Sequence, residues 1–183
     1  MTASSPPPRP PTTLVLLGLR GAGKSTLGPM IGARAGLPFV DLDDRTRESL
    51  GHATVADAWR TLGEPAFRDA EVRALRAALN DPVCVLALGG GTPTAPGAAD
   101  VLRTAARARR ITIMYLHAPP DALRARLREG DANRPSLTGQ GVLDEINAVY
   151  RARDPLYRSL ATHIVDATTP IGAQLEAVNR AWK

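Results

Sequence analysis

Several residue types are scarce in this chain, and each shortage excludes a class of protein. There is one cysteine among 183 residues, so the chain cannot build an internal disulfide framework. Cys84 stands in an apolar run, which favours a small buried hydrophobe over a nucleophile or a metal ligand. No apolar stretch reaches the roughly 20 residues of a membrane span, and residues 1–11 lack the apolar segment of a secretory signal. We therefore expect a protein of the reducing cytoplasm with no membrane partner.

Aromatic residues are also scarce, at 4% of the chain. A net charge of +5 and the arginines clustered between residues 103 and 110 are compatible with nucleic-acid binding. However, the sequence shows no aromatic stacking platform and no known nucleic-acid module. We interpret the charge as a solvated basic face, or as a field that attracts small polyanions, and expect no nucleic-acid partner.

Lysine is almost absent, because Lys24 is the only lysine before the final residue and the other basic positions are arginine. Lys24 lies in a segment with the full spacing of a phosphate-binding P-loop, Gly18-Leu19-Arg20-Gly21-Ala22-Gly23-Lys24-Ser25-Thr26. An apolar run at 14–17 predicts a buried strand before the segment, and residues 25–35 predict a helix after it. This context favours a phosphate site over a glycine-rich turn without a ligand.

Each residue type in the P-loop has a physical function. Gly18, Gly21 and Gly23 permit backbone dihedral angles closed to other residues, so that successive amide groups turn toward a phosphate. Lys24 places an ammonium group on the terminal phosphates, and the Ser25 hydroxyl is short enough to enter the coordination shell of Mg²⁺. We therefore predict that the phosphates of ATP are bound by Gly21, Ala22, Gly23, Lys24, Ser25 and Thr26.

The length and the hydrophobic pattern predict the fold class. A chain of this length is expected to fold as one domain and to bury about 70% of its unfolded surface. Apolar β-type runs alternate with helical patterns, which predicts an α/β fold with a parallel sheet from strands at 14–17, 39–40, 83–88, 111–116 and 163–165. One helix is predicted to begin at Glu64-Pro65 and to end at 80–82. The proline-rich residues 1–11 predict a disordered tail, and residues 12–183 a single domain.

A long polar segment rich in glycine lies at about 129–141. It is longer than a simple connection between two helices, and it carries a cation, Arg134, that can approach a phosphate. We interpret this segment as a mobile lid rather than as a plain surface loop.

Three further features concern the second substrate. Asp41 and Asp43 follow the second predicted strand, where the alternation of an extended segment would direct both carboxylates to one side. The triple glycine 89–91 follows the third strand, where a ligand can meet the backbone directly. That strand has no acidic residue at its end, so Asp41 is the natural support for Mg²⁺. The candidates to face an anion are Arg68, Arg134 and Arg153.

With these motifs in this order, the sequence resembles the shikimate kinases. The resemblance runs from about residue 12 to about residue 177 and includes the P-loop, both aspartates, the triple glycine and the segments 67–68, 133–139 and 153–157. It implies a three-layer P-loop kinase fold with a five-stranded parallel sheet, helices on both faces and a mobile lid. It also implies a monomer that transfers the γ-phosphoryl group of ATP to the 3-hydroxyl of shikimate, in the biosynthesis of aromatic amino acids.

The resemblance implies roles for the residues that match the family motifs. Lys24, Asp43 and Arg134 are the expected catalytic residues, and Asp43 is the residue that hydrogen-bonds the hydroxyls of shikimate. Ser25 and Asp41 are expected to hold Mg²⁺, Asp41 through water. The electrostatics agree, because phosphoryl transfer needs in-line placement and neutralisation of the charge on the phosphate oxygens. Either aspartate alone also fits a second interpretation, as the cap of the following helix.

On the acceptor side, the resemblance implies that Arg68 and Arg153 hold the carboxylate of shikimate, with backbone contacts from Gly90 and Gly91. A planar guanidinium matches a carboxylate in a way that a lysine cannot. Three alternatives stay open, because Arg68 with Glu71 also fits a surface ion pair, Arg153 an exposed helix position and the triple glycine an ordinary turn. In the first case, Glu71 can instead hold the guanidinium in position.

The adenine site is the least defined in the sequence, and the candidates are Arg126 or Arg128 above the base and Pro170 beneath it. Pro29 departs from the family pattern, because it falls inside the helix of the P-loop and is expected to kink it. Two other functions remain open: a kinase of another small hydroxy acid such as gluconate, and a ligand sensor that has lost catalysis. The triple glycine with its arginine pair argues against the first, and the short tail and the retained catalytic residues argue against the second.

Overall fold

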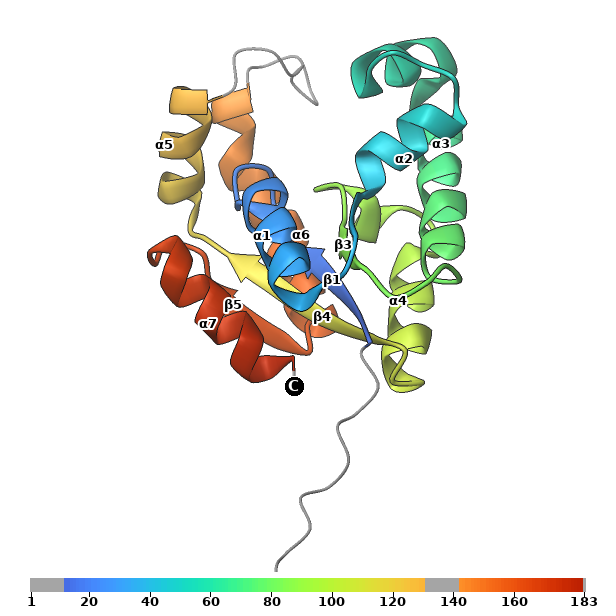
Figure 1. Ribbon diagram of the computed structural model, residues 1–183. Helices are drawn as coiled ribbons and strands as arrows, with labels where there is room; N and C mark the ends of the chain where they lie inside the picture. Colours follow the sequence, from blue (N-terminus) through green and yellow to red (C-terminus); the bar gives the residue numbers. More distant parts are fainter. Residues whose placement is uncertain (1–11, 131–141, 183) are drawn as a thin grey trace, which may run out of the picture.

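The computed structural model describes residues 12–130 and 142–182, and its centre is a five-stranded sheet (Figure 1). The strands are β1 (Thr13–Leu17), β2 (Phe39–Asp41), β3 (Val85–Ala87), β4 (Ile111–His117) and β5 (His163–Asp166). All pairs are parallel, and the strand order is β2-β3-β1-β4-β5. All five predicted strands form, which confirms the α/β fold with a parallel sheet. The predicted tail at 1–11 and residues 131–141 of the predicted lid lie outside the described residues.

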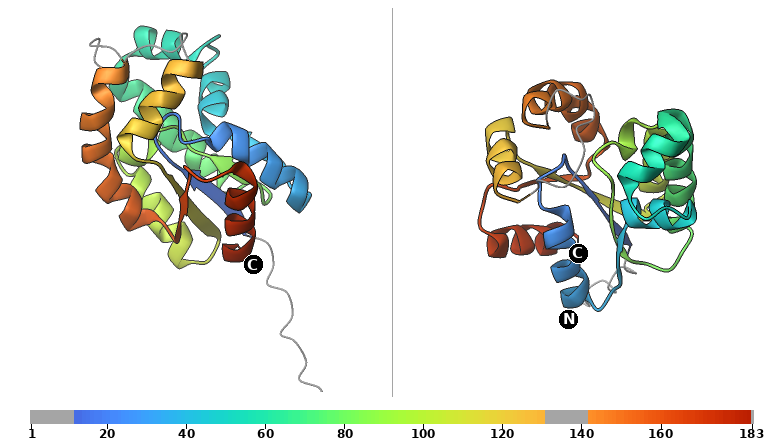
Figure 2. Two further views of the ribbon diagram at one scale, coloured as in Figure 1. Left: turned by 90° about the vertical axis from the view of Figure 1, so that its left-hand side faces the viewer. Right: turned by 90° about the horizontal axis from the view of Figure 1, so that it is seen from above.

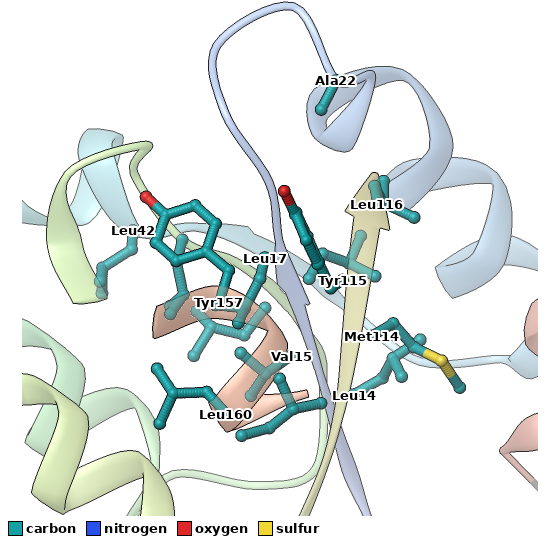
Figure 3. Packing of buried hydrophobic residues seen from close by; sticks show 14 of the residues in the cluster. Leu14, Val15, Leu17, Ala22, Leu42, Met114, Tyr115, Leu116, Tyr157 and Leu160 are labelled. Carbon is teal, nitrogen blue, oxygen red and sulfur yellow. The ribbon is translucent and has the colours of Figure 1, made fainter. Parts of the chain in front are cut away.

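Strand β1 occupies the middle of the sheet and of the hydrophobic core (Figure 3). Leu14, Val15 and Leu16 are fully buried, since β3 and β4 flank the strand and helices cover both faces. Burial on two faces explains why a continuous apolar run, rather than an alternating pattern, predicts this strand. Cys84 is buried in the same core, as the sequence predicts.

Helices cover both faces of the sheet. The described residues form α1 (Lys24–Ala35), α2 (Leu42–Ser49), α3 (Val55–Ala78), a 3₁₀ turn (Thr92–Thr94), α4 (Ala98–Arg107), α5 (Pro120–Gly130), α6 (Val142–Leu160) and α7 (Ile171–Ala181). Helices α1 and α7 lie on one face, and α4 and α6 pack on β4 from the other (Figure 2). The three-layer fold is therefore confirmed. None of these helices in the described ranges is both long enough and apolar enough to cross a membrane.

Two helices bear on the expectations. Helix α1 runs from Lys24 through Pro29 to Ala35, which agrees with the helix predicted at 25–35. Helix α3 bends at Gly63, whose φ of 77° and ψ of 163° lie outside the helical region. The helix predicted to begin at Glu64-Pro65 is therefore the second half of α3. The sequence pattern does not predict the first half, although Thr54 carries an N-cap signal and its side chain accepts a hydrogen bond from the Asp57 amide.

The carboxyl ends of the parallel strands place the candidate residues at one edge of the sheet. The P-loop follows β1, Asp41 is the last residue of β2, and the triple glycine 89–91 comes shortly after β3. These three strands are neighbours in the sheet. The edge is thus the place where parallel α/β proteins bind their ligands.

Candidate active site

The P-loop owes its shape to glycines that serve two different purposes. Gly21 and Gly23 have positive φ angles of 80° and 94°, which other residues adopt only with strain. Gly18 does not have a positive φ, so the prediction that its dihedral angles require glycine is wrong. Instead, a methyl group at Gly18 would lie 2.9 Å from the Ala22 Cβ and 3.0 Å from the Leu116 carbonyl oxygen. Gly18 is therefore needed for close packing of the loop on β4.

Lys24 begins α1 and folds back over the P-loop. Its ammonium group donates to the carbonyl oxygens of Gly18 and Leu19, at 2.7 Å and 3.2 Å. The N-cap of α1 is Gly23, which has no side chain to cap the first turn of the helix. The positive end of the helix and the lysine thus meet at the mouth of the loop, an arrangement suited to an anion.

Asp41 joins the P-loop to the second strand. The Ser25 hydroxyl donates to one carboxylate oxygen of Asp41 at 3.1 Å, and the Asp43 amide donates to the other at 3.0 Å. Asp41 is therefore the N-cap of α2, which confirms the interpretation as a helix cap, and it is also a neighbour of the P-loop serine. The prediction of an extended segment through Asp43 is wrong, because Asp43 lies in the first turn of α2.

The carboxylate of Asp43 lies over the backbone of Gly89. A methyl group at Gly89 would lie 2.1 Å from the Asp43 Oδ1 atom and 2.9 Å from the Thr92 hydroxyl. Only glycine leaves room for the carboxylate at this point. The missing side chain of Gly89 therefore lets the Asp43 carboxylate lie close to the backbone of the triple glycine.

Arg68 is held from several sides on α3. Its guanidinium donates to Glu71 at 2.6 Å and to Glu64 at 3.4 Å, and its Cζ atom lies 4.8 Å from the centre of the Trp59 ring. A methyl group at Gly91 would lie 2.5 Å from the Arg68 Nη1 atom. The side chain is only 11% exposed, so the alternative of a surface ion pair does not describe it.

Glu71 holds the Arg68 guanidinium in place by an ion pair. Its side chain is 2% exposed, and its second oxygen accepts a hydrogen bond of 2.7 Å from the Thr92 hydroxyl. The expectation that Glu71 holds the guanidinium of Arg68 is therefore confirmed. The sequence does not predict Thr92, because it lies 21 residues from Glu71 and carries no motif of its own.

Arg153 and Tyr157 both bind the carbonyl oxygen of Gly90 from α6. Arg153 donates at 2.7 Å, and the Tyr157 hydroxyl donates to the same oxygen. Burial raises the pKa of Tyr157 to about 12, although the nearby Arg153 opposes the rise. Because the Gly90 carbonyl oxygen already accepts these two hydrogen bonds, the triple glycine can offer a ligand its backbone N–H groups rather than this oxygen. Tyr157 is missed by sequence reasoning, although its place one helical turn after Arg153 is a usable signal.

A second polar cluster fixes α6 to β4 behind these contacts. The Tyr115 hydroxyl donates to Asp154 at 2.8 Å, and Arg158 donates to the other carboxylate oxygen at 2.7 Å. Burial raises the pKa of Tyr115, and the hydrogen bond to Asp154 adds to the rise. Burial would also raise the pKa of Asp154, but the bonds from Arg158 and Tyr115 outweigh it and lower that pKa. Tyr115 and Tyr157 lie among the buried hydrophobic side chains (Figure 3).

The candidates for the adenine site differ in exposure and in hydrogen bonding. Arg126 donates to the carbonyl oxygens of Gly21 and Ala167, so both ends of its guanidinium are bound to the backbone. Arg128 and Pro170 are exposed. Arg134 lies outside the described residues, as does most of the predicted lid, whereas the backbone of 129–130 completes α5.

The candidate metal site is made of two hard oxygen donors. The Ser25 hydroxyl and the Asp41 carboxylate are in direct contact. In the ranges that the structure describes, no cluster of three or more His, Cys, Asp or Glu residues could hold a metal ion. Two oxygen ligands with water completing the shell suit Mg²⁺, which keeps several waters and binds mainly to substrate phosphates.

Comparisons with known proteins agree with this geometry. The family model described as shikimate kinase matches residues 20–179. A shikimate kinase of Rhodopirellula baltica is 41% identical over 165 residues, which cover 86% of this chain and 83% of that protein.

Solved structures of the same family are similar as well. A shikimate kinase from Bacteroides thetaiotaomicron has a TM-score of 0.81 at 28% identity, over 92% of this chain and 97% of that one. A shikimate kinase from Acinetobacter baumannii, solved in complex with shikimate, has a TM-score of 0.78 at 28% identity, over 92% and 89%. The family match over most of the chain and the fold likeness point the same way: this chain belongs to the shikimate kinase family.

Proposed function

We propose that this protein is a shikimate kinase, which transfers the γ-phosphoryl group of ATP to the 3-hydroxyl of shikimate. The products are shikimate 3-phosphate and ADP, in the chorismate route to aromatic amino acids. The observation that carries the proposal is the junction of the P-loop with the triple glycine. A methyl group at Gly90 would lie 3.4 Å from the Arg20 amide nitrogen, while the Gly90 carbonyl accepts from Arg153. The phosphate loop and an arginine suited to a carboxylate therefore meet at one residue.

On the donor side, the chain's own residues supply positive charge and orientation. Lys24 leaves the carbonyl oxygens of Gly18 and Leu19 and binds the terminal phosphates of ATP. Ser25 and Asp41 hold Mg²⁺, Asp41 through water. When bound, Mg²⁺ neutralises charge on the phosphate oxygens as the transfer proceeds.

On the acceptor side, side chains orient shikimate for an in-line attack. Arg68 and Arg153 bind its carboxylate, a pairing that a planar guanidinium makes with two parallel hydrogen bonds. Asp43 accepts a hydrogen bond from the 3-hydroxyl and takes its proton as the oxygen bonds to the γ-phosphorus and the bond to ADP breaks. Arg134, outside the described residues, is proposed to bind the transferred phosphoryl group. Positioning and electrostatics together account for the catalysis, because phosphoryl transfer asks for no covalent intermediate on the protein.

All residues in this proposal belong to one chain, so we propose the monomer as the catalytic unit. We place it in the cytoplasm, where ATP is available and a buried thiol such as Cys84 stays reduced. Sedimentation at micromolar concentration checks the first point, and a stable dimer would contradict it.

A coupled assay of ADP release tests the function directly. Mg²⁺·ATP is supplied with shikimate, with gluconate or with no acceptor, at equal concentrations. We expect release with shikimate alone, and a fall of roughly 10²-fold in the variant Asp43→Asn, which keeps the shape but removes the proton acceptor. Release with gluconate would indicate another kinase. No release from folded, ATP-binding protein would indicate a ligand sensor.

A further inference from the structure

Thr92 has a fixed position at the start of the 3₁₀ turn that follows the triple glycine. The residue is fully buried. Its amide donates to the Gly89 carbonyl oxygen at 3.1 Å, and its own carbonyl oxygen accepts from the Ala95 amide at 3.0 Å. A methyl group at Gly89 would lie 2.9 Å from the Thr92 hydroxyl, so the side chain packs directly on the glycine backbone. The hydroxyl of Thr92 is therefore held in one place beside the triple glycine.

Glu71 binds two different partners with its two carboxylate oxygens. One oxygen accepts from the Thr92 hydroxyl at 2.7 Å, and the other accepts from the Arg68 Nη1 atom at 2.6 Å. The residue is 2% exposed, so little water can take the place of either donor. A carboxylate and a guanidinium frequently pair through two parallel hydrogen bonds. The bond from Thr92 draws one oxygen away from that arrangement, and the ion pair uses one oxygen and one nitrogen.

This single pairing leaves the second terminal nitrogen of Arg68 for a ligand. The hydrogen bonds of Arg68 to described residues come from Nη1 and from Nε, which donates to Glu64 at 3.4 Å. The Nη2 atom lies against the triple glycine, since a methyl group at Gly91 would lie 2.8 Å from it. The arginine thus presents this nitrogen at the place where we propose that the carboxylate of the acceptor binds.

We propose that Thr92 is a positioning residue for the acceptor substrate. Its hydroxyl holds one oxygen of Glu71, so that Glu71 fixes the Arg68 guanidinium without occupying both of its terminal nitrogens. Without this hydroxyl, the Glu71 carboxylate can turn toward Arg68 and compete with the carboxylate of shikimate. The inference rests on the proposed function, since it requires that Arg68 binds shikimate.

Two variants of Thr92 separate its hydrogen bond from its packing. Thr92→Val keeps the shape and loses the hydroxyl, whereas Thr92→Ser keeps the hydroxyl. Calorimetry gives the dissociation constant of shikimate, and steady-state kinetics give kcat and the KM of ATP. We expect Thr92→Val to weaken shikimate binding about fivefold with kcat and the KM of ATP unchanged, and Thr92→Ser to bind as the wild type does.

A control variant and a double variant show whether the effect passes through Glu71. Thr13→Val removes another buried hydroxyl, which accepts from the Cys84 amide at 3.4 Å, and should lower Tm without changing shikimate affinity. In a Glu71→Ala background, Thr92→Val should cause no further loss of shikimate affinity, because the group that it positions is gone.

Several outcomes would overturn the inference. If Thr92→Val lowers Tm and binds shikimate as the wild type does, the hydroxyl serves the fold alone. If Thr92→Ser binds shikimate as weakly as Thr92→Val, the methyl group matters and not the hydrogen bond. An equal rise in the KM of ATP would indicate general damage to the site. These three results leave the proposed function standing, whereas a wild type that neither binds nor phosphorylates shikimate would overturn the proposed function itself.

Discussion

The two halves of the candidate active site are built in different ways. The donor half is mainly backbone, since the P-loop is one continuous segment whose form depends on glycine dihedral angles and on close packing. The acceptor half is mainly side chains, which come from α2, α3 and α6 and gather around the triple glycine. The first half is encoded by adjacent residues, whereas the second exists only after distant helices have packed together.

This difference predicts different responses to substitution. In the donor half, a side chain such as Lys24 is proposed to act on the ligand, and its printed hydrogen bonds stay within the P-loop, so its loss should reduce turnover far more than stability. In the acceptor half, the groups proposed to orient the substrate are also largely buried and paired, as Arg68 is with Glu71. Changes there should affect stability and shikimate affinity together.

The largest expected effect is that of Lys24→Ala. We expect turnover to fall by roughly 10²-fold or more, because about 3 kcal/mol of stabilisation of the transition-state charge is lost. The midpoint of thermal unfolding and the dissociation constant of shikimate should stay unchanged. Steady-state kinetics and thermal unfolding check this. A large loss of stability would mean that the donor half is also held by its side chains.

Glu71→Ala should have the largest effect on stability. The change leaves the mostly buried guanidinium of Arg68 without its shortest ion pair and removes the acceptor of the Thr92 hydroxyl. Removing one partner of a buried pair costs about 3 kcal/mol. Glu71→Gln is the matched control, because it keeps the shape and hydrogen-bonding capacity and should lose less. Urea unfolding of both variants gives the two values, and equal losses would show that the charge of Glu71 alone accounts for the stabilisation, and not its shape or hydrogen bonds.

Much of the fold follows from the sequence, because its signals are local. The apolar runs predict all five strands, and the P-loop predicts the turn and the helix that follow β1. The bend at Gly63 and the position of Asp43 in the first turn of α2 are not predicted. Each depends on a boundary between two elements: the two halves of α3 in the first case, and β2 and α2 in the second. Polar residues at such a boundary fit the start of a helix and an extended segment equally well.

The same distinction applies to the site. The sequence predicts which residues carry chemistry, since each stands in a motif, but it does not show what holds them. Thr92 beneath Glu71, Tyr157 on the Gly90 carbonyl and Arg126 on the Gly21 carbonyl join residues 21, 67 and 105 positions apart. Such supports have no motif, because any donor that reaches the same carbonyl or carboxylate would serve.

The triple glycine allows a finer test of the comparison, since its residues face different groups. A methyl group at Gly91 would displace the guanidinium of Arg68, so Gly91→Ala should raise the KM for shikimate by about tenfold. A methyl group at Gly89 would displace the Asp43 carboxylate, so Gly89→Ala should mainly lower kcat. Gly90→Ala meets its nearest atom at 3.4 Å and should have the smallest effect. Kinetics with both substrates check these results, and the same change in all three variants would contradict the separate roles.

The smallest expected effect concerns Asp154, which adjoins Arg153 in sequence but binds β4 instead of the pocket. Its pKa is lowered in the folded state, so its contribution to stability is present above the ordinary aspartate range and is lost as the pH falls through the lowered value. Asp154→Asn should therefore lower Tm by about 3 °C near pH 7, and this difference should shrink as the pH falls below about 4. Arg153→Lys should act mainly on shikimate, with a raised KM and only a small loss of Tm, because a lysine can still donate to the Gly90 carbonyl oxygen. A Tm difference for Asp154→Asn that persists to pH 3 would mean that its shape, and not its charge, holds α6 against β4.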